Sequence, residues 1–245
     1  MIKCENSFIK SKINFTKLCI FCAMAKFLEK NTYICEWLND LLTMKISPPK
    51  FIRKMFPELV WQIEDERGVY LTFDDGPTPG ITEWILEILK RHNAKATFFV
   101  LAKNVEKYPD LYAKILADGH RVGNHTYSHQ KGFMMSLERY LEDVDMASGL
   151  VQSDLFRPPY ARITPSQLRA VAQRYKIVMW SVISRDYNRK ITREMCLRGV
   201  LPHIKAGAII LFHDSEKSFP NMSYALPRTL ERIEQLGLKC KAIEL

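Results

Sequence analysis

The feature that most constrains the fold of this chain is a regular alternation, after Val69, between short β-prone runs and helical periods. The runs are rich in β-branched and aromatic residues, whereas Ile81, Ile85 and Leu89 are spaced to share one face of a helix. Strands separated by helices pair in parallel through right-handed crossovers. The seven expected strands are residues 69–73, 96–101, 121–124, 155–157, 176–183, 208–212 and 239–243.

The expected helices lie between these strands and carry start and stop signals. Thr164 is placed as an N-cap with Pro165 in the first helical position, and Gly119 and Gly207 follow the ends of two helices. The helices are expected at residues 81–92, 109–118, 136–151, from 164 onward, 192–205 and 226–236.

The alternation predicts an α/β fold, a distorted (β/α) barrel with about seven parallel strands. Seven strands are one fewer than in a regular barrel, so we expect an irregular or open one, with an open doubly wound sheet as the alternative. A chain of 245 residues suits a single barrel. Its 47% apolar and 26% charged residues exclude disordered, collagen-like and coiled-coil chains.

Residues 1–43 differ from the rest, because they contain no glycine and no proline but four of the six cysteines. Their best apolar run, residues 18–25, is short for a signal peptide and precedes no clear cleavage pattern. We predict an extension outside the working fold at 1–43, a lead-in segment at 44–68 and a catalytic domain at 69–245. An over-extended translation start, a poor export or membrane-surface segment and a genuine appendage all stay open, and with them the cellular location.

The composition also limits the partners. The net charge is +9, but lysine and arginine are spread along the chain, which favours general basicity over binding to an anionic polymer. No nucleic-acid-reading motif is present, and no apolar stretch is long enough to span a membrane. Cys19 and Cys22 form a single C-x-x-C, which is weak evidence for zinc, and the cysteines form no disulfide framework. The oligomeric state stays open.

Polar residues follow the predicted strands at their carboxyl ends, the face where parallel barrels place their sites. Each has an ordinary structural interpretation: Asp-Asp-Gly-Pro is a common turn, Arg-Pro-Pro-Tyr a rigid loop, and a histidine after an apolar strand is often buried. Their collection on one face favours a site. The residues are Asp74, Asp75, His125, His129, Arg157, Asp186, His213 and Asp214.

Two histidines and one carboxylate form an open metal site, which leaves a position for water. A metal lowers the pKa of bound water towards ~7 and polarises a carbonyl group. A second carboxylate can take the proton of that water, and a later histidine can protonate a leaving group. Together these groups are suited to the hydrolysis of an amide or an ester.

Four segments resemble four of the five motifs of the polysaccharide deacetylases, also known as the NodB homology domain or carbohydrate esterase family four. They occur in the family's order, and the resemblance covers residues 69–245. It implies a distorted (β/α) barrel. The segments are residues 72–77 (Thr-Phe-Asp-Asp-Gly-Pro), 125–129 (His-Thr-Tyr-Ser-His), 157–160 (Arg-Pro-Pro-Tyr) and 211–214 (Leu-Phe-His-Asp).

The resemblance implies roles for individual residues. The metal ligands would be Asp75, His125 and His129, and the metal is usually zinc, with another divalent ion such as Co²⁺ or Ni²⁺ as an alternative. Asp74 would be the catalytic base. The other implied roles are orientation of that base by Arg157, proton donation to the leaving amine by His213, oxyanion binding by the Tyr160 backbone N–H, and an acetyl pocket at Leu211, with Pro158 also binding substrate.

The fourth motif differs from the family pattern of Asp-x-x-Asp-Trp. After Trp180, Ile183 stands where the first aspartate is often found, and Tyr187 replaces the tryptophan. Asp186 is retained and could hold His213 in its charged form. The differences therefore concern the pocket wall and the substrate more than the chemistry.

We therefore predict a metal-dependent hydrolase that removes N-acetyl groups from amino sugars of a peptidoglycan-like or chitin-like glycan. A hydrolase of O-acetyl xylan or of a small cyclic amide would keep the same site with another substrate. A non-catalytic glycan-binding relative is a further alternative, which the presence of every inferred ligand, acid and base disfavours. The expected partner is a glycan, with neither nucleic acid nor stable membrane insertion.

Overall fold

The computed structural model describes residue 56 and residues 58–245, so the prediction for residues 1–43 lies outside the described residues. In the described part, nine strands form one sheet whose named pairs are all parallel, in the order β1-β6-β5-β4-β3-β2-β8-β7, with β9 beside β2. The strands are β1 Leu59–Val60, β2 Gly68–Asp74, β3 Ala96–Val100, β4 Arg121–Asn124, β5 Leu155–Phe156, β6 Lys176–Val178, β7 Val182–Ile183, β8 Ile209–His213 and β9 Lys239–Cys240.

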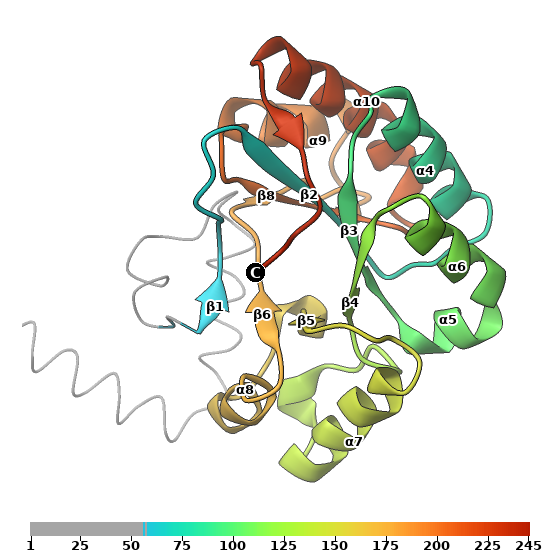
Figure 1. The fold of residues 1–245 in the computed structure, drawn as a ribbon, viewed down its shortest axis with the longest axis vertical. Coiled ribbons are helices and arrows are strands. Elements are labelled where there is room, and N and C mark those ends of the chain that lie inside the picture. Colours follow the sequence, from blue (N-terminus) through green and yellow to red (C-terminus); the bar gives the residue numbers. More distant parts are fainter. Residues whose placement is uncertain (1–55, 57) are drawn as a thin grey trace, which may run out of the picture.

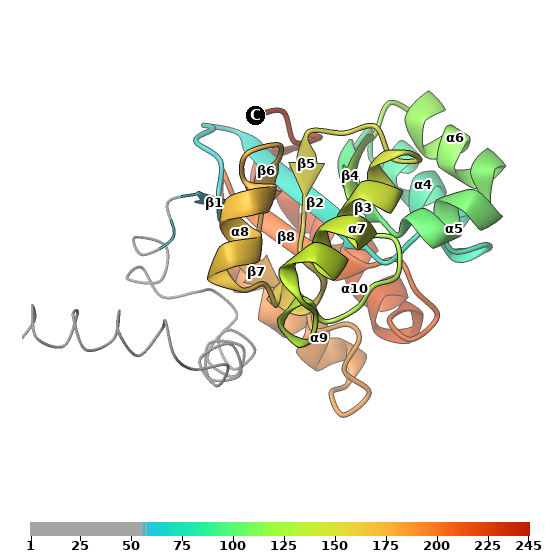
Figure 2. The same ribbon diagram turned by 90° about the horizontal axis from the view of Figure 1, so that it is seen from below.

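Helices surround the curled sheet, as Figure 1 shows along the shortest axis and Figure 2 shows from below. This is the expected distorted barrel. None of the helices in the described residues is long and apolar enough to cross a membrane. The helices are α4 Ile81–Arg91, α5 Ala102–Lys107, α6 Pro109–Ala117, α7 Leu137–Ser148, α8 Pro165–Val171, α9 Arg193–Val200 and α10 Phe219–Gln235.

The strand expected at residues 176–183 is wrong in one respect, because it divides into β6 and β7 with no helix between them. Between these strands, the backbone N–H of Met179 donates to Val60 O and that of Ser181 donates to Ile209 O. One continuous apolar segment therefore contacts β1 near one end of the sheet and β8 near the other. This segment brings the two ends of the curled sheet together.

The structure differs from the sequence expectation in three other places. Strand β1 lies within the lead-in segment, α5 adds a short helix after β3, and α10 begins at Phe219 instead of residue 226. The predicted start of α8 is confirmed: Thr164 Oγ1 accepts from Gln167 N at 3.3 Å, and Gln167 Oε1 accepts from Thr164 N at 3.0 Å. This reciprocal pair satisfies two backbone N–H donors at the helix start.

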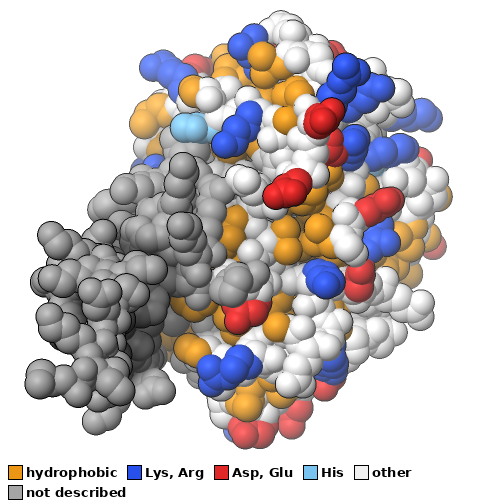
Figure 3. All heavy atoms as spheres, turned by 60° about the vertical axis from the view of Figure 1, so that its left-hand side comes forward, with side chains coloured by type: hydrophobic (Ala, Val, Ile, Leu, Met, Phe, Trp, Pro, Cys, Tyr) orange, Lys and Arg blue, Asp and Glu red, His pale blue; other side chains and the backbone are white. Residues whose placement is uncertain are grey.

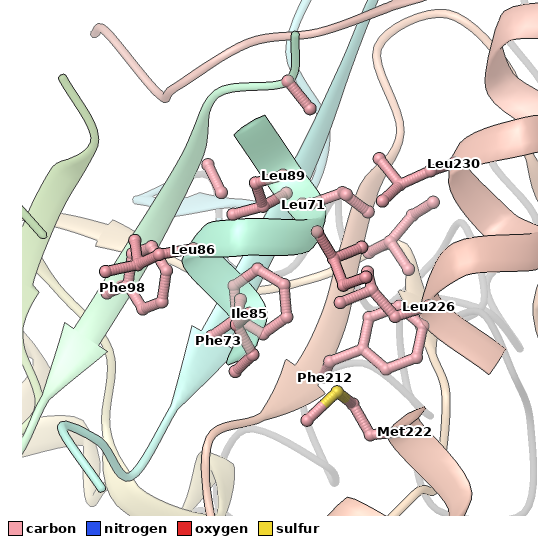
Figure 4. Close-up of a cluster of buried hydrophobic side chains, with 14 of the residues drawn as sticks. Leu71, Phe73, Ile85, Leu86, Leu89, Phe98, Phe212, Met222, Leu226 and Leu230 are labelled. Carbon is pink, nitrogen blue, oxygen red and sulfur yellow. The ribbon is translucent and has the colours of Figure 1, made fainter. Parts of the chain in front are cut away.

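The main apolar core lies between the sheet and its covering helices. Figure 4 shows Ile85 and Leu89 of α4, together with Leu226 of α10, beside side chains from β2, β3 and β8. The ring centres of Phe73 and Phe98, on neighbouring strands, lie 5.1 Å apart. Burying each such large apolar side chain contributes about 1.5–3 kcal/mol to folding.

Strand alternation sends a second set of side chains to the inside of the curl. Along β2, Leu71 and Phe73 belong to the outer core, so Thr72 and Asp74 face the other way. Along β8, Leu211 belongs to an inner cluster of apolar residues. The interior of the curl therefore combines an apolar cluster with a few buried polar side chains such as Thr72, and the charged candidate residues lie where the strands end.

The surface in Figure 3 carries lysine and arginine interspersed with aspartate and glutamate over the described residues of that face. No single-sign patch dominates this view, in keeping with the dispersed basic residues of the sequence.

Candidate active site

Loops after the parallel strands bring the candidate residues together at the carboxyl end of the sheet. Asp74 closes β2 and is the direct register partner of His213 on β8. His125 follows β4, whose last residue Asn124 pairs with Phe156 of β5. Because the strands are parallel and in this register, the residues after them share one edge.

Three of these residues form a candidate metal centre. Asp75 Oδ1 lies 3.1 Å from His129 Nε2 and 3.7 Å from His125 Nε2. One ligand atom from each residue lies within 4.8 Å of the others. Asp75 Oδ1 is buried and has no hydrogen-bond donor among the described residues, so it is an acceptor that a cation would satisfy.

The chemistry of this donor set fits a divalent ion. One carboxylate oxygen and two imidazole nitrogens are the ligands of catalytic zinc sites, where a position stays open. His125 Nδ1 lies 2.7 Å from the carbonyl oxygen of Arg157 and must donate to it, which leaves Nε2 with its lone pair. His125 is therefore held in the tautomer whose Nε2 can bind a metal ion.

Burial and charge favour the ligand forms of these groups. Burial lowers the pKa of His125 to about 4, against the opposing charge of Asp74, so the ring is neutral near pH 7. Burial raises the pKa of the Asp75 carboxyl, but the contact with His129 and the charge of His213 outweigh it and hold that pKa well below its usual range. Asp75 is therefore ionised.

Asp74 is held by a buried arginine. Arg157 Nη1 donates to Asp74 Oδ1 at 2.7 Å and to Thr72 Oγ1 at 2.8 Å. The same guanidinium donates to the carbonyl oxygens of Val178, at 2.9 Å, and Met179, at 2.8 Å. Asp74 Oδ2 lies 3.8 Å from His125 Nε2. One oxygen of Asp74 is thus committed to the guanidinium while the other is near the candidate metal ligands.

His213 is paired with a buried carboxylate. Its Nδ1–H donates to Asp186 Oδ1 at 2.7 Å, and its backbone N–H donates to Asp186 Oδ2 at 2.7 Å. Burial lowers the pKa of His213, but the charge and the hydrogen bond of Asp186 outweigh it and raise this pKa to about 9. The imidazole is therefore charged at neutral pH, with Nε2–H left as a donor.

A cleft of about 500 Å³ joins these groups. Arg157 and Asp186 do not line it, because both are fully buried behind its wall. Asp214 is also buried and does not line it. The remaining candidate site residues do line the cleft: Asp74, Asp75, His125, His129, Pro158, Tyr160, Tyr187, Leu211 and His213.

Aromatic rings form opposite parts of this cleft. The ring of Tyr160 lies 4.6 Å from that of His129, and the ring of Tyr187 meets His213 edge-on at 5.0 Å. Tyr160 has a φ of 59°, and its backbone N–H has no acceptor among the described residues. That N–H is therefore available to a ligand.

Sequence reasoning missed several residues that shape the site. Trp180, Ser215 and Lys217 also line the cleft. Thr72 contacts Arg157, and its place two residues before Asp74 on the same strand face was the available signal. Asp214 was among the predicted site residues, but it is buried outside the cleft lining, where it accepts a hydrogen bond from Thr82 at 2.6 Å, a contact that nothing in the sequence indicated.

The curled parallel sheet carries a cluster of two histidines and one carboxylate. Beside it lie the arginine-bound carboxylate of Asp74 and the charged imidazole of His213. Together these features define a hydrolase of the barrel type. The sequence model described as polysaccharide deacetylase matches residues 62–180. The chain belongs to the polysaccharide deacetylase family, as its motifs indicated.

Named relatives support this membership. A peptidoglycan-N-acetylglucosamine deacetylase of Bacillus cereus is 37% identical over 154 residues, 60% of this chain and 56% of the relative. A chitooligosaccharide deacetylase of a Bradyrhizobium species is 36% identical over 160 residues, 62% of this chain and 73% of the relative. The chain thus spans just over half the length of the first of these relatives.

A solved structure supports the fold. The Bc1960 peptidoglycan N-acetylglucosamine deacetylase, bound to 4-naphthalen-1-yl-N-oxidanyl-benzamide, superposes with a TM-score of 0.70 at 31% identity. The match covers 76% of this chain and 91% of the other. The distorted barrel expected from the sequence is confirmed.

Proposed function

We propose that this chain is a metal-dependent deacetylase that removes N-acetyl groups from amino sugars of a peptidoglycan-like or chitin-like glycan. The observation that carries the proposal is the meeting of one carboxylate and two imidazoles with a second carboxylate and a charged imidazole in a single cleft. The names of the relatives, which act on peptidoglycan and on chitooligosaccharide, support this substrate class.

Asp75, His125 and His129 would hold the ion, for which Zn²⁺ suits the donor set. When bound, the ion supplies an acidified water and a polarised acetamide carbonyl.

The residues of the chain itself handle the protons. Asp74 Oδ2 accepts the proton of the attacking water, because Oδ1 is occupied by Arg157. His213 Nε2–H then gives its proton to the departing amine nitrogen as the C–N bond breaks, and acetate is the other product. Asp186 stabilises the charged imidazole until that transfer.

The walls of the cleft position the acetamide. The free backbone N–H of Tyr160 would donate to the carbonyl oxygen as negative charge develops on it. Leu211 gives an apolar surface for the acetyl methyl group, and Pro158 and Tyr187 line the cleft beside the sugar. A hydrogen-bond donor that is already in position needs no reorientation during the reaction, and for this reason such donors lower the activation barrier effectively.

Acetate release from N-acetylglucosamine oligomers, peptidoglycan fragments and acetylated xylan fragments, with zinc and with a chelator, tests the proposal. Asp74→Asn should reduce turnover by about 10²–10⁴-fold while the metal stays bound. His125→Ala should lose the metal, as measured by metal analysis of the purified protein. Lys90→Gln, at an exposed position of α4, is the matched control and should behave as wild type. If the folded, zinc-loaded protein released acetate only from xylan fragments, the result would contradict the N-acetyl substrate and support a hydrolase of O-acetyl xylan.

A further inference from the structure

Lys217 lies at the edge of the cleft, on the turn between β8 and α10, and the proposed reaction gives it no role. It lines the cleft with Ser215. Its ammonium nitrogen lies 5.6 Å from the ring centre of Tyr187, which itself meets the ring of His213 at 5.0 Å. Lys217 is therefore one aromatic ring away from the proposed proton donor, within reach of a sugar beside the reacting one.

The turn that carries Lys217 is held by hydrogen bonds. The backbone N–H groups of Ser218 and Phe219 donate to Ser215 O at 3.0 and 3.1 Å. Ser215 Oγ donates to Ser218 Oγ at 3.2 Å, and Ser218 is buried. The backbone under Lys217 is thus fixed relative to the cleft, although its side chain is exposed.

The charge of Lys217 is not neutralised within the protein. No carboxylate forms an ion pair with it among the described residues, and it is the one lysine or arginine that lines the cleft. The acids that line the cleft are committed elsewhere, Asp74 to Arg157 and Asp75 to the two histidines. An anion at this edge would therefore meet a cation that no carboxylate of the described residues pairs with.

Among the described residues that line the cleft, none beside Lys217 is an acid that would repel such an anion, and the neighbouring Glu216 is exposed and lies outside the lining. Ile183 and Tyr187 form its apolar and aromatic surface, and Asp186 below them is buried and paired with His213. Tyr187 therefore gives apolar surface against which a sugar can pack while Lys217 contacts a charged substituent.

We propose that Lys217 binds a carboxylate on the sugar next to the N-acetylated one, so that the cleft prefers a carboxylate-bearing amino-sugar glycan over a neutral one. This proposal rests on the deacetylase function, and it narrows the substrate from any N-acetylated glycan to an acidic one.

The test compares two tetrasaccharides with the same backbone. One alternates N-acetylglucosamine with N-acetylmuramic acid, and in the other the muramic carboxylates are converted to neutral methyl amides. The wild-type KM should be about 3- to 10-fold lower for the acid, the range expected of a partly exposed charge-assisted contact. Lys217→Gln should make the two KM values equal, and Lys217→Arg should keep the difference. Lys90→Gln, outside the cleft lining, should leave the ratio of the KM values unchanged.

Binding to the Asp74→Asn variant, with and without Lys217→Gln, separates the two claims. Acetate release from both glycans, with a ratio of KM values that Lys217→Gln does not change, would overturn the carboxylate site and leave the deacetylase in place. Absence of acetate from both glycans would overturn the deacetylase. In that case, tighter binding of the acid that is lost with Lys217→Gln would still support the carboxylate site, and equal binding of both glycans would refute it.

Discussion

Replacing Arg157 tests whether the buried guanidinium holds the site together. The residue is fully buried and makes four hydrogen bonds, to Asp74, Thr72, Val178 O and Met179 O. Arg157→Met removes all of them and leaves the Asp74 carboxylate buried with no guanidinium. Breaking a buried ion pair on one side costs about 3–5 kcal/mol. For a domain of this size, about 2–4 °C of melting temperature per kcal/mol gives a fall of about 6–20 °C.

The assay is thermal unfolding followed by circular dichroism, with and without zinc. Arg157→Lys keeps the charge but cannot span the two backbone carbonyls and Asp74, so each carbonyl left without a donor should cost about 1–3 kcal/mol. Arg91→Met is the matched control, because Arg91 forms an exposed ion pair with Glu87 on α4, and such exposed pairs contribute about 0–1 kcal/mol to stability. If the Arg157→Met protein had the same melting temperature as the Arg91→Met control, the structural role given to the buried Arg157 guanidinium would be refuted.

Two further predictions concern His213 and Gly76. The pKa of His213 is raised to about 9. The stabilisation from its ion pair with Asp186 is therefore fully present below about pH 6.5 and is lost as the pH rises through about 9, and the proton that His213 donates is lost over the same range. Asp186→Asn should move the alkaline limb of kcat/KM to lower pH, and an unmoved limb would contradict this pairing. Gly76→Ala places a Cβ 2.1 Å from Asp214 Oδ2 and should cost about 1–3 kcal/mol in urea unfolding, whereas Gly149→Ala, 3.6 Å from its nearest neighbour, should not.

The sequence predicts the parts of the fold that depend on local pattern. The apolar runs of β2, β3 and β8 are long enough to locate the strands, and the parallel order then places Asp74 beside His213. Every residue that follows such a strand could be assigned to one edge of the sheet without coordinates. This is why the sequence alone was sufficient to predict that the candidate ligands would be neighbours.

Features that depend on distant partners could not be predicted in this way. Residues 176–183 form one uninterrupted β-prone run, and only the acceptors Val60 O and Ile209 O divide it into two strands. Strand β1 has two residues and no recognisable pattern. Pro227 disfavours a long helix locally, yet α10 continues through it because the apolar face of the helix is buried against the sheet, whereas Pro220 lies in the first turn, where proline is tolerated.

Backbone strain at the site follows the same logic. Asp75, Thr126, His129 and Tyr160 all have φ between 59° and 80°, a region in which residues other than glycine are held at a cost of about 1–3 kcal/mol each. Glycine would remove that cost, but two of these residues are candidate metal ligands and need their side chains. Hydrogen bonds offset part of this cost: Asn104 Nδ2, from α5, donates to Asp75 O at 2.8 Å, and within the loop after β4 the backbone N–H of His129 donates to Thr126 Oγ1 at 3.1 Å. The direction of the Asp75 side chain therefore depends on a residue of another element, and the pattern of its own loop could not have revealed it.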